Sequence, residues 1–284
     1  MKRFYIVDAF THEAFGGNPA GVVLLDDDAW PGSRLMEQVA AELRYSETAF
    51  VRQLDATRYE LRYFTPCCEV DVCGHATIAA FGVLRHEGLV LDGARCQCNT
   101  RAGQLEVTAG DQVMMTMAPP VVKPASIDAA QLHRIIDSTN TATLWPGWPI
   151  EAVLTGLPDI ILPVADVKTL NALRPDMESL AALSEQLGVV GVHAFAFRQD
   201  SFTAHVRNFA PRYGIPEEAA TGTANAALTH YLRRHSLAGD CEECRFVQGE
   251  AMRRTSVVQT VVADDGTIGV GGQYCIVAQG ELMV

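Results

Sequence analysis

The sequence has no long apolar run and no excess of basic residues. No segment approaches the roughly 20 consecutive apolar residues that a membrane helix needs, so we expect no membrane partner. Acidic residues outnumber basic ones by 34 to 22, which gives a formal net charge of −12. A chain without a basic stripe is a poor match for a phosphate backbone, so we expect no nucleic-acid partner. A small anionic metabolite remains possible, because it needs only a local positive site.

Nucleotide-binding fingerprints are also missing. The turn Gly16-Gly17-Asn18-Pro19 leads into the strand-like run Ala20–Leu25, and no Gly-Lys-Ser/Thr follows it at a helix start, so it is not a phosphate loop. The turn is either a structural bend or a place where backbone amides contact a substrate. We therefore predict a chemistry without a cofactor.

The first residues lack the apolar stretch of a secretion signal, so we expect the eight cysteines to be thiols in a reducing, cytoplasmic compartment. Cys67, Cys68, Cys73 and His75 lie close together in the sequence, and Cys241-Glu242-Glu243-Cys244 is a single CxxC. A second pair at zinc-finger spacing is missing, so we predict no metal. The role of the Cys241/Cys244 pair stays open.

The most informative stretch that is present runs from Cys73 to Ala80. Small and apolar residues follow Gly74 at helical spacing, and the short strand pattern Arg62–Pro66 precedes it. A thiol, a glycine and the imidazole of His75 are thus predicted at the beginning of a helix. Unpaired backbone N–H groups and the positive end of the helix dipole favour an anion there.

The same pattern recurs later in the chain. Thr221-Gly222-Thr223-Ala224 opens a second helix pattern, and 224 − 76 and 221 − 73 both give an offset of 148 residues. An identical register in both halves indicates a duplicated domain. We predict domains at 1–118 and 119–284, joined in the proline-rich segment 118–124, with the last strand free to pack back on the first domain. Each half has many strands and few helices, which predicts an α+β fold with mostly antiparallel sheets.

Three carboxylates are candidate proton carriers. Glu47 lies between a helix pattern for which Ser33 is the expected N-cap and the strand run Ala49–Val51, where it is either a solvated edge residue or a group in a dry site. Glu217 and Glu218 precede the second helix, as dipole partners or as a second general acid/base. Cys73 and His75 are either buried core residues or groups that handle a proton.

Several stretches together resemble the PhzF-like family, named after the phenazine biosynthesis isomerase, over nearly the whole chain. They are Asp8-Ala9-Phe10, Gly17-Asn18-Pro19-Ala20, Ser46-Glu47-Thr48-Ala49-Phe50, Phe64-Thr65-Pro66, Glu69-Val70, Cys73-Gly74-His75-Ala76-Thr77, Gly214-Ile215-Pro216-Glu217, Thr221-Gly222 and Gln248-Gly249. The resemblance implies a diaminopimelate epimerase-like fold. Two duplicated barrel-like domains, each a sheet wrapped around a central helix, are related by a pseudo-twofold with a cleft between them. It also implies a homodimer.

The resemblance implies roles for individual residues. Glu47 is the general acid/base and His75 binds and polarises the substrate. Glu218 stands where the family has an aspartate, one methylene longer, and Ala219 replaces the family's proline. Cys73 occupies the place of one racemase cysteine, whereas Thr221 stands at its partner position, which predicts a one-sided proton transfer. The expected substrate contacts are Asn18, Ser46, Cys73, Gly74, Thr221, Gly222 and Thr223.

The leading hypothesis is a cofactor-independent isomerase that moves a proton on a small carboxylate-bearing metabolite in the cleft. An alternative is an epimerase or dehydratase in which Cys73 carries the proton. A third hypothesis is a binding protein that keeps the fold without turnover, because Glu218-Ala219 departs from the family pattern. The sequence does not name the substrate.

Overall fold

The computed structural model describes residues 2–25, 29–137, 147–197, 200–237, 239 and 242–283. Cys241 and the turn at Trp145-Pro146 lie outside these ranges. The chain divides into two compact units, each described here by itself. Unit 1 holds residues 1–116 and 271–284, and unit 2 holds residues 117–270. Within the described ranges, no helix is long and apolar enough to cross a membrane.

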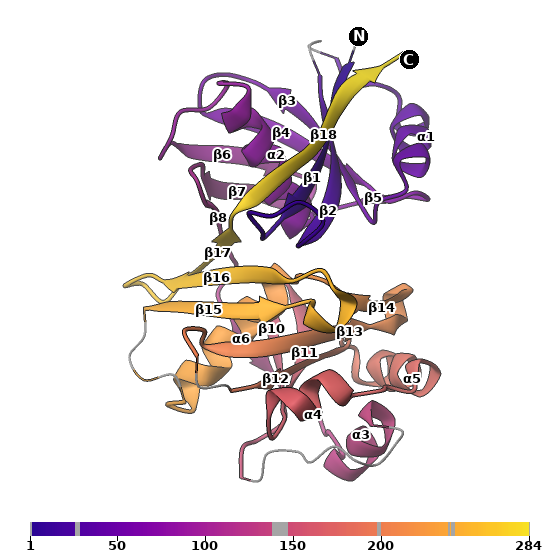
Figure 1. The fold of residues 1–284 in the computed structure, drawn as a ribbon, viewed down its shortest axis with the longest axis vertical. Coiled ribbons are helices and arrows are strands. Elements are labelled where there is room, and N and C mark those ends of the chain that lie inside the picture. The colour runs from indigo at the N-terminus through magenta and orange to yellow at the C-terminus, as the bar shows by residue number, and fades with distance from the viewer. Residues whose placement is uncertain are drawn as a thin grey trace. The chain divides into compact units, whose positions relative to one another are not determined.

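Unit 1 is a sheet with two helices, and its last strand comes from the far end of the chain (Figure 1). Its strands are β1 (Lys2–Ala9), β2 (Asn18–Leu24), β3 (Thr48–Gln53), β4 (Arg58–Phe64), β5 (Glu69–Val70), β6 (Arg95–Thr100), β7 (Gly103–Thr108), β8 (Val113–Thr116) and β18 (Tyr274–Leu282). Its helices are α1 (Ser33–Leu43) and α2 (Gly74–His86). Strand β1 pairs antiparallel with both β2 and β18. Pairs β2–β3 and β4–β6 are parallel, and β3–β4 and β6–β7 are antiparallel.

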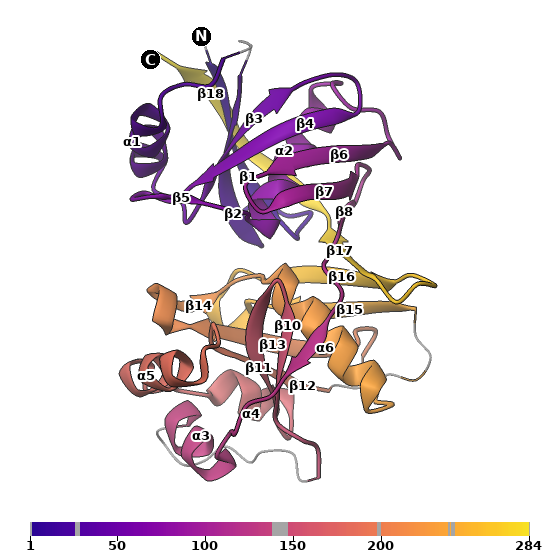
Figure 2. The same ribbon diagram turned by 180° about the vertical axis from the view of Figure 1, so that it is seen from behind.

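Helix α2 is the centre of unit 1. Every residue from His75 to Leu84 is buried, which leaves the helix no solvent-facing side. Strands β1, β2, β3, β8 and β18 contact it, and both views show it enclosed by the sheet (Figures 1 and 2). Small residues allow this close approach: a Cβ on Gly82 would lie 2.5 Å from the ring of Tyr274. The expectation of a sheet wrapped around a central helix is confirmed.

Unit 2 repeats this plan. Its strands are β9 (Val121–Lys123), β10 (Glu151–Thr155), β11 (Leu157–Pro163), β12 (Val192–Ala196), β13 (Ala204–Ala210), β14 (Ile215–Glu218), β15 (Glu243–Gln248), β16 (Ser256–Val262) and β17 (Ile268–Gly272), the last of which crosses the unit boundary. Its helices are α3 (Ala129–Ile136), α4 (Val167–Ala172), α5 (Met177–Leu187) and α6 (Gly222–Arg234), with short 3-10 turns at Pro211–Tyr213 and Glu250–Met252.

Strand pairing shows the duplication directly. Pairs β10–β11, β12–β13 and β15–β16 are antiparallel, and β11–β12 and β13–β15 are parallel, in the same chain order as in unit 1. Strand β9 flanks β10 as β18 flanks β1, both antiparallel. Helix α6 precedes β15 as α2 precedes β6. The two units are therefore copies of one α+β fold.

The copies differ at the residue that the sequence analysis singled out. In unit 1 the Gly21 N–H donates to the carbonyl of Glu47 at 3.1 Å, and in unit 2 the Ile160 N–H donates to the carbonyl of Gly191 at 3.0 Å. These equivalent bonds align Glu47 with Gly191. A Cβ on Gly191 would lie 1.8 Å from the carbonyl oxygen of Phe209, so no side chain fits there. Only unit 1 carries a carboxylate at this place.

Some local predictions were wrong. The segment 118–124, read as a linker, contains β9, because its valines pair with β10. Gly32, not Ser33, is the N-cap of α1, and Ser33 is its first residue. Helix α3 begins at Ala129, since the Asp128 carboxylate accepts from the N–H groups of Ala130 and Gln131. The sequence pattern did not predict the short helix α4 at Val167–Ala172.

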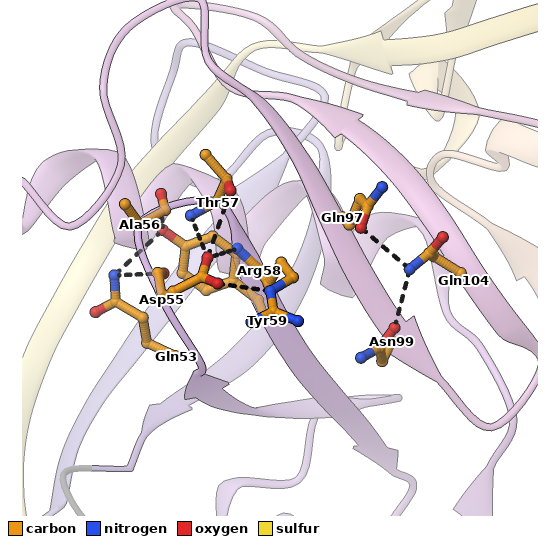
Figure 3. Close-up of polar contacts among 9 residues, drawn as sticks. All are labelled: Gln53, Asp55, Ala56, Thr57, Arg58, Tyr59, Gln97, Asn99 and Gln104. Carbon is orange, nitrogen blue, oxygen red and sulfur yellow. Dashed lines mark hydrogen bonds and ion pairs between the residues drawn. The ribbon is translucent and has the colours of Figure 1, made fainter.

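The hairpin between β3 and β4 shows how a local polar network ends a strand (Figure 3). The Asp55 carboxylate accepts from the N–H groups of Thr57 and Arg58 at 2.9 and 2.8 Å, and it also pairs with the Arg58 guanidinium. The backbone bond from Thr57 contributes most to lowering the pKa of Asp55 to about 2. The Tyr59 hydroxyl then donates to the carbonyl of Leu89 at 2.9 Å, which ties the hairpin to the segment after α2.

Gly191→Ala tests the asymmetry between the units. The added methyl group has to displace the Phe209 carbonyl, so we expect the substitution to cost about 2 kcal/mol of unfolding free energy and to lower the urea midpoint. Gly32→Ala is the steric control, because nothing lies within 4 Å of its Cβ, and we expect only the loss of a favourable N-cap residue, below about 1 kcal/mol. Equal stability of both variants would show that Gly191 is not sterically required.

Candidate active site

The beginning of α2 is fixed by buried hydroxyl groups. Cys73 is the N-cap, in an extended conformation. Its carbonyl accepts from the Thr77 N–H at 3.0 Å and from Thr77 Oγ1 at 2.7 Å. Since the Thr77 hydroxyl donates to a carbonyl, the Tyr63 hydroxyl, 2.7 Å away, has to donate to Thr77 Oγ1. Strand β4 thus holds the helix start through two hydrogen bonds with a defined direction.

Four residues predicted for the site meet at this helix start. His75 Nε2 lies 3.3 Å from Glu47 Oε2 and 3.4 Å from Ser46 Oγ. Cys73 Sγ lies 3.4 Å from His75 Nδ1 and 3.8 Å from His75 Nε2. Gly74 separates Cys73 from His75 and is the first residue of α2. We call Ser46, Glu47, Cys73 and His75 the α2 cluster.

The α2 cluster is nearly dry. The side chain of His75 is 7% exposed and that of Glu47 is 16% exposed. Burial lowers the pKa of His75 below its usual value, while the charge of Glu47 opposes this shift to a smaller extent. The imidazole is therefore neutral at pH 7. Glu47 Oε2 is fully buried and accepts no hydrogen bond, since its 3.3 Å contact with His75 lacks hydrogen-bond geometry.

An acceptor oxygen left unsatisfied in a dry site is costly for folding alone. It is an observation that points to chemistry, because a carboxylate oxygen without a donor is ready to take a proton from a bound molecule. Neutral His75 beside it supplies a donor or an acceptor to that molecule. The carboxylate and the imidazole come from different segments, 28 residues apart in the sequence.

Asn18 lies at the first position of β2, opposite Ala9 of β1, and is buried. The preceding turn needs glycine at position 17, where φ is +57° and a Cβ would lie 2.1 Å from the carbonyl oxygen of Ala9. The Phe15 N–H donates to the buried Asp8 carboxylate at 2.7 Å, which closes the turn. These contacts explain a structural role for the turn, and substrate binding by Asn18 stays a prediction.

The beginning of α6 in unit 2 is built differently. Thr221 is its N-cap, and its hydroxyl donates to Glu218 Oε2 at 2.6 Å. Gly222 is the first helical residue, and the carbonyl of Thr223 accepts from the Thr155 hydroxyl at 2.6 Å. We call Glu218, Thr221, Gly222 and Thr223 the α6 cluster. Its four members are the residues that the sequence analysis placed together.

The structure separates the roles of two adjacent glutamates. Glu217 forms a bidentate pair with the Arg207 guanidinium, with both N–O distances at 2.8 Å. Arg207 is buried and also donates to the carbonyls of Leu170 and Leu173, so this pair fastens β14 to the end of α4. Glu218 is the carboxylate that faces the start of α6. The ion pair with Arg207 gives Glu217 a structural role that neither of the two readings from the sequence had included.

Two members of the α6 surroundings were missed by residue-level reasoning. Gln248 and Asn225 are fully buried, and both bond to Thr221. The available signal was weak: Gln248 entered only as part of a family-like Gln-Gly pair, and Asn225 read as an ordinary helical position. Long-range side-chain bonds of this kind leave no local periodicity.

Glu47, Cys73 and His75 are also a potential metal site. Each offers one ligand atom, and the three atoms lie within 4.8 Å of one another. A carboxylate, a thiolate and an imidazole are ligands that zinc accepts. Cys67 and Cys68, the other thiols considered from the sequence, are exposed and contact Thr65 instead. The prediction that the site works without metal is tested below.

A cavity of about 430 Å³ lies elsewhere in unit 2, between α3 and α5. Its walls include Gln131, Arg134, Asp176 and Ser179. It contains no member of either cluster, and the charged groups that line it are ordinary solvent-facing helix residues. We assign it no role in the chemistry.

The duplicated α+β fold is that of the proline racemases. The chain aligns over its full length with 93% of a probable proline racemase from Agrobacterium radiobacter, with a TM-score of 0.59 at 13% identity, a likeness of fold alone. A Bacillus anthracis protein of the PhzF family is closer, with a TM-score of 0.88, 25% identity and complete coverage of both chains.

The family model "Phenazine biosynthesis-like protein" matches residues 7–280. The uncharacterized isomerase YddE of Escherichia coli O157:H7 is 33% identical over 270 residues, which cover 92% of this chain and 90% of that protein. The chain belongs to the phenazine biosynthesis-like, or PhzF, family. Its relatives are named as uncharacterized isomerases, which supports an isomerase in general without specifying a reaction.

The charge state of His75 gives a testable prediction. Because burial lowers the pKa of His75, we expect its ring to titrate at a lower pH than an exposed histidine in ¹⁵N NMR spectra. Glu47→Gln removes the one charge that raises this pKa, so the His75 titration should move further down. Glu13→Gln removes an exposed carboxylate of the same unit and should leave it unchanged. An upward shift in Glu47→Gln would contradict the assigned electrostatics.

Proposed function

We propose that the protein is a cofactor-independent isomerase that moves a proton on a small carboxylate-bearing metabolite. The observation that carries the proposal is the buried Glu47 Oε2 without a hydrogen-bond donor, 3.3 Å from neutral His75. Glu47 takes a proton from carbon, and the electron pair of the broken C–H bond delocalises into the substrate's π system. The protonated carboxyl group then returns the proton to another carbon, so atoms and charge balance without an added reagent.

Neighbouring groups fit the other needs of this reaction. Neutral His75 can donate a hydrogen bond to the developing anion, and Ser46 contacts the same ring nitrogen. The backbone N–H groups at the start of α2 suit the substrate carboxylate. Burial keeps water from quenching the carbanion-like intermediate and strengthens each electrostatic contact. A cyclic or acyclic substrate would satisfy these groups equally.

The proposal includes the α6 cluster. Following the family resemblance, Glu218 and the start of α6 are assigned to the same substrate in an interdomain cleft, in a homodimeric protein. Supporting this role, Glu218 is anchored to the helix start by Thr221, while Glu217 is committed to Arg207. The alignment of Glu47 with Gly191 supports a one-sided transfer, since unit 2 lacks an equivalent carboxylate.

A second candidate function rests on Cys73. Its sulfur lies 3.4 Å from His75 Nδ1, so the imidazole could take the thiol proton and leave a thiolate base. The protein would then be a Cys73-dependent epimerase or dehydratase. A third candidate, a binding protein without turnover, keeps the same geometry and predicts ligand binding without isotope exchange.

Glu47→Gln should abolish proton transfer. Candidate cyclic amino and hydroxy acids are incubated with the protein in D₂O, and deuterium uptake is measured by NMR. We expect exchange to fall by about 10²- to 10⁴-fold in Glu47→Gln, because the amide cannot accept the proton.

Cys73→Ala serves as the comparison and should retain most of the exchange. The reverse pattern, with Cys73→Ala inactive and Glu47→Gln active, would transfer the role to the thiol. Tight binding of a ligand that never exchanges in the unmodified protein would favour the binding-protein hypothesis.

Metal removal tests the cofactor-free mechanism. We expect exchange to be unchanged after dialysis against a chelator, because the carboxylate accepts the proton without a Lewis acid. Zinc added in excess should inhibit, since it would occupy Glu47, Cys73 and His75 together. Activity that disappears with the chelator and returns with zinc would replace the proposed mechanism by a metal-assisted one.

A further inference from the structure

A chain of buried amide and imidazole groups leads to the α6 cluster. Gln248 makes four hydrogen bonds with its side-chain amide. Its Oε1 accepts from the Thr221 N–H at 3.1 Å and from Asn225 Nδ2 at 3.0 Å. Its Nε2 donates to the Glu218 carbonyl at 2.9 Å and to Thr221 Oγ1 at 3.0 Å. A backbone N–H only donates and a carbonyl only accepts, so these two partners fix which end of the amide is oxygen.

The direction of the Thr221 hydroxyl follows. Because Gln248 Nε2 donates to Thr221 Oγ1, the hydroxyl hydrogen is left for its other partner, Glu218 Oε2, at 2.6 Å. Glu218 is thus held as an acceptor at this oxygen, which favours its ionised form. The Glu218 side chain is one methylene longer than the family's aspartate, and the hydrogen bond from Thr221 fixes its carboxylate.

The donor and acceptor of each further hydrogen bond in this network, away from the helix start, can be assigned in the same way. Asn225 Nδ2 donates to the Thr221 carbonyl at 2.9 Å, so Asn225 Oδ1 has to be the atom 3.3 Å from His193 Nε2. His193 therefore carries its proton on Nε2, and its Nδ1 accepts from Asn208 Nδ2 at 3.4 Å. Burial lowers the pKa of His193 to about 3, which agrees with one neutral tautomer.

Asn208 ends the chain at a buried carboxyl group. Its Nδ2 also lies 3.4 Å from Oδ1 of Asp159. Burial raises the pKa of Asp159 to about 7, and the Asn208 contact opposes this to a smaller extent. The five residues of this network are each at most 1% exposed: Asp159, Asn208, His193, Asn225 and Gln248. Asn and Gln amides do not pass protons along, so this network orients groups and is not a proton wire.

We propose that Gln248, Asn225 and His193 are positioning residues that aim the Thr221 hydroxyl at Glu218 and hold Glu218 as a carboxylate acceptor. Unit 1 supports the specificity of this device. There, the residue aligned with Asn225 at the 148-residue offset is Thr77, which is oriented by Tyr63 and bonds to no carboxylate. A catalytic effect of these residues rests on the proposed function, whereas the hydrogen bonds themselves do not depend on it.

The test measures Glu218 itself, without substrate. The full-length protein is labelled with ¹³C-glutamate, and the Glu218 carboxyl signal is assigned by its loss in Glu218→Gln. Thr221→Val removes the hydroxyl at nearly constant volume, and we expect the Glu218 titration midpoint to rise by about one pH unit. Thr221→Ser keeps the hydroxyl and should leave the midpoint unchanged. Gln248→Met should raise it, because the hydroxyl is no longer directed.

Gln248→Met removes four buried hydrogen bonds and could fail to fold. The comparison of Thr221→Val with Thr221→Ser, and a measurement of the His193 tautomer, therefore test the proposal independently of it. A long-range ¹H–¹⁵N spectrum of the unmodified protein should show His193 protonated on Nε2 only, from pH 5 to pH 8. Protonation on Nδ1 would reverse the donor order and overturn the proposal. So would a midpoint that stays the same in Thr221→Val or rises equally in Thr221→Ser.

These outcomes separate the proposal from the isomerase assignment. If deuterium exchange is never observed but the Glu218 and His193 measurements agree with expectation, the network stands and the proposed function falls. If exchange depends on Glu47 but Thr221→Val leaves the Glu218 midpoint unchanged, the function stands and the positioning role falls. Where both hold, Thr221→Val should shift the acidic limb of the pH profile of exchange upward, and Thr221→Ser should leave it in place.

Discussion

The structure depends on the complete burial of a short helix made of small residues in each unit. A helix enclosed by strands on all sides can be reached by a ligand only at its ends. In unit 1 every residue from His75 to Leu84 is buried, and in unit 2 the run from Ala224 to Thr229 is buried in the same way. Alanine, glycine and threonine make this possible because they let strands approach closely. The start of α2 therefore combines a positive dipole end with a nearly dry surrounding, whereas Thr221, Gly222 and Thr223 at the start of α6 are half-buried.

The buried polar side chains in the first turns of the two helices, Thr77 and Asn225, impose a second constraint, which the two units meet in different ways. Such groups have to be paired inside the protein. Thr77 and Asn225 each bond back to the carbonyl of the N-cap residue, Cys73 or Thr221. Beyond that, one unit uses a tyrosine on β4 and the other uses amides and a histidine on β12, β13 and β15. The two units thus share one fold but pair their buried polar groups through different side chains.

Against this background of paired groups, Glu47 is an exception. The described residues give its buried Oε2 no hydrogen-bond donor, and burial disfavours the imidazolium form of His75 beside it. In the second unit the aligned position is Gly191, which a carbonyl oxygen fills. Among the described residues, unit 1 thus carries a buried carboxylate oxygen that unit 2 lacks at the aligned position, and this asymmetry supports the proposed one-sided proton transfer.

The sequence by itself determined the duplication, both helix starts and the α+β class, because helical spacing and strand alternation are local patterns that a 148-residue offset repeats intact. It also brought Ser46, Glu47, Cys73 and His75 into one list through family resemblance. It misread Val121–Lys123 as a linker, since a three-residue strand gains its stability from its partner β10 and not from its own pattern. Only the tertiary structure separated Glu217 from Glu218 and revealed the bonds of Gln248, 27 residues from Thr221. Such contacts are decided by which strands the fold places beside a helix, and no short-range period in the chain records them.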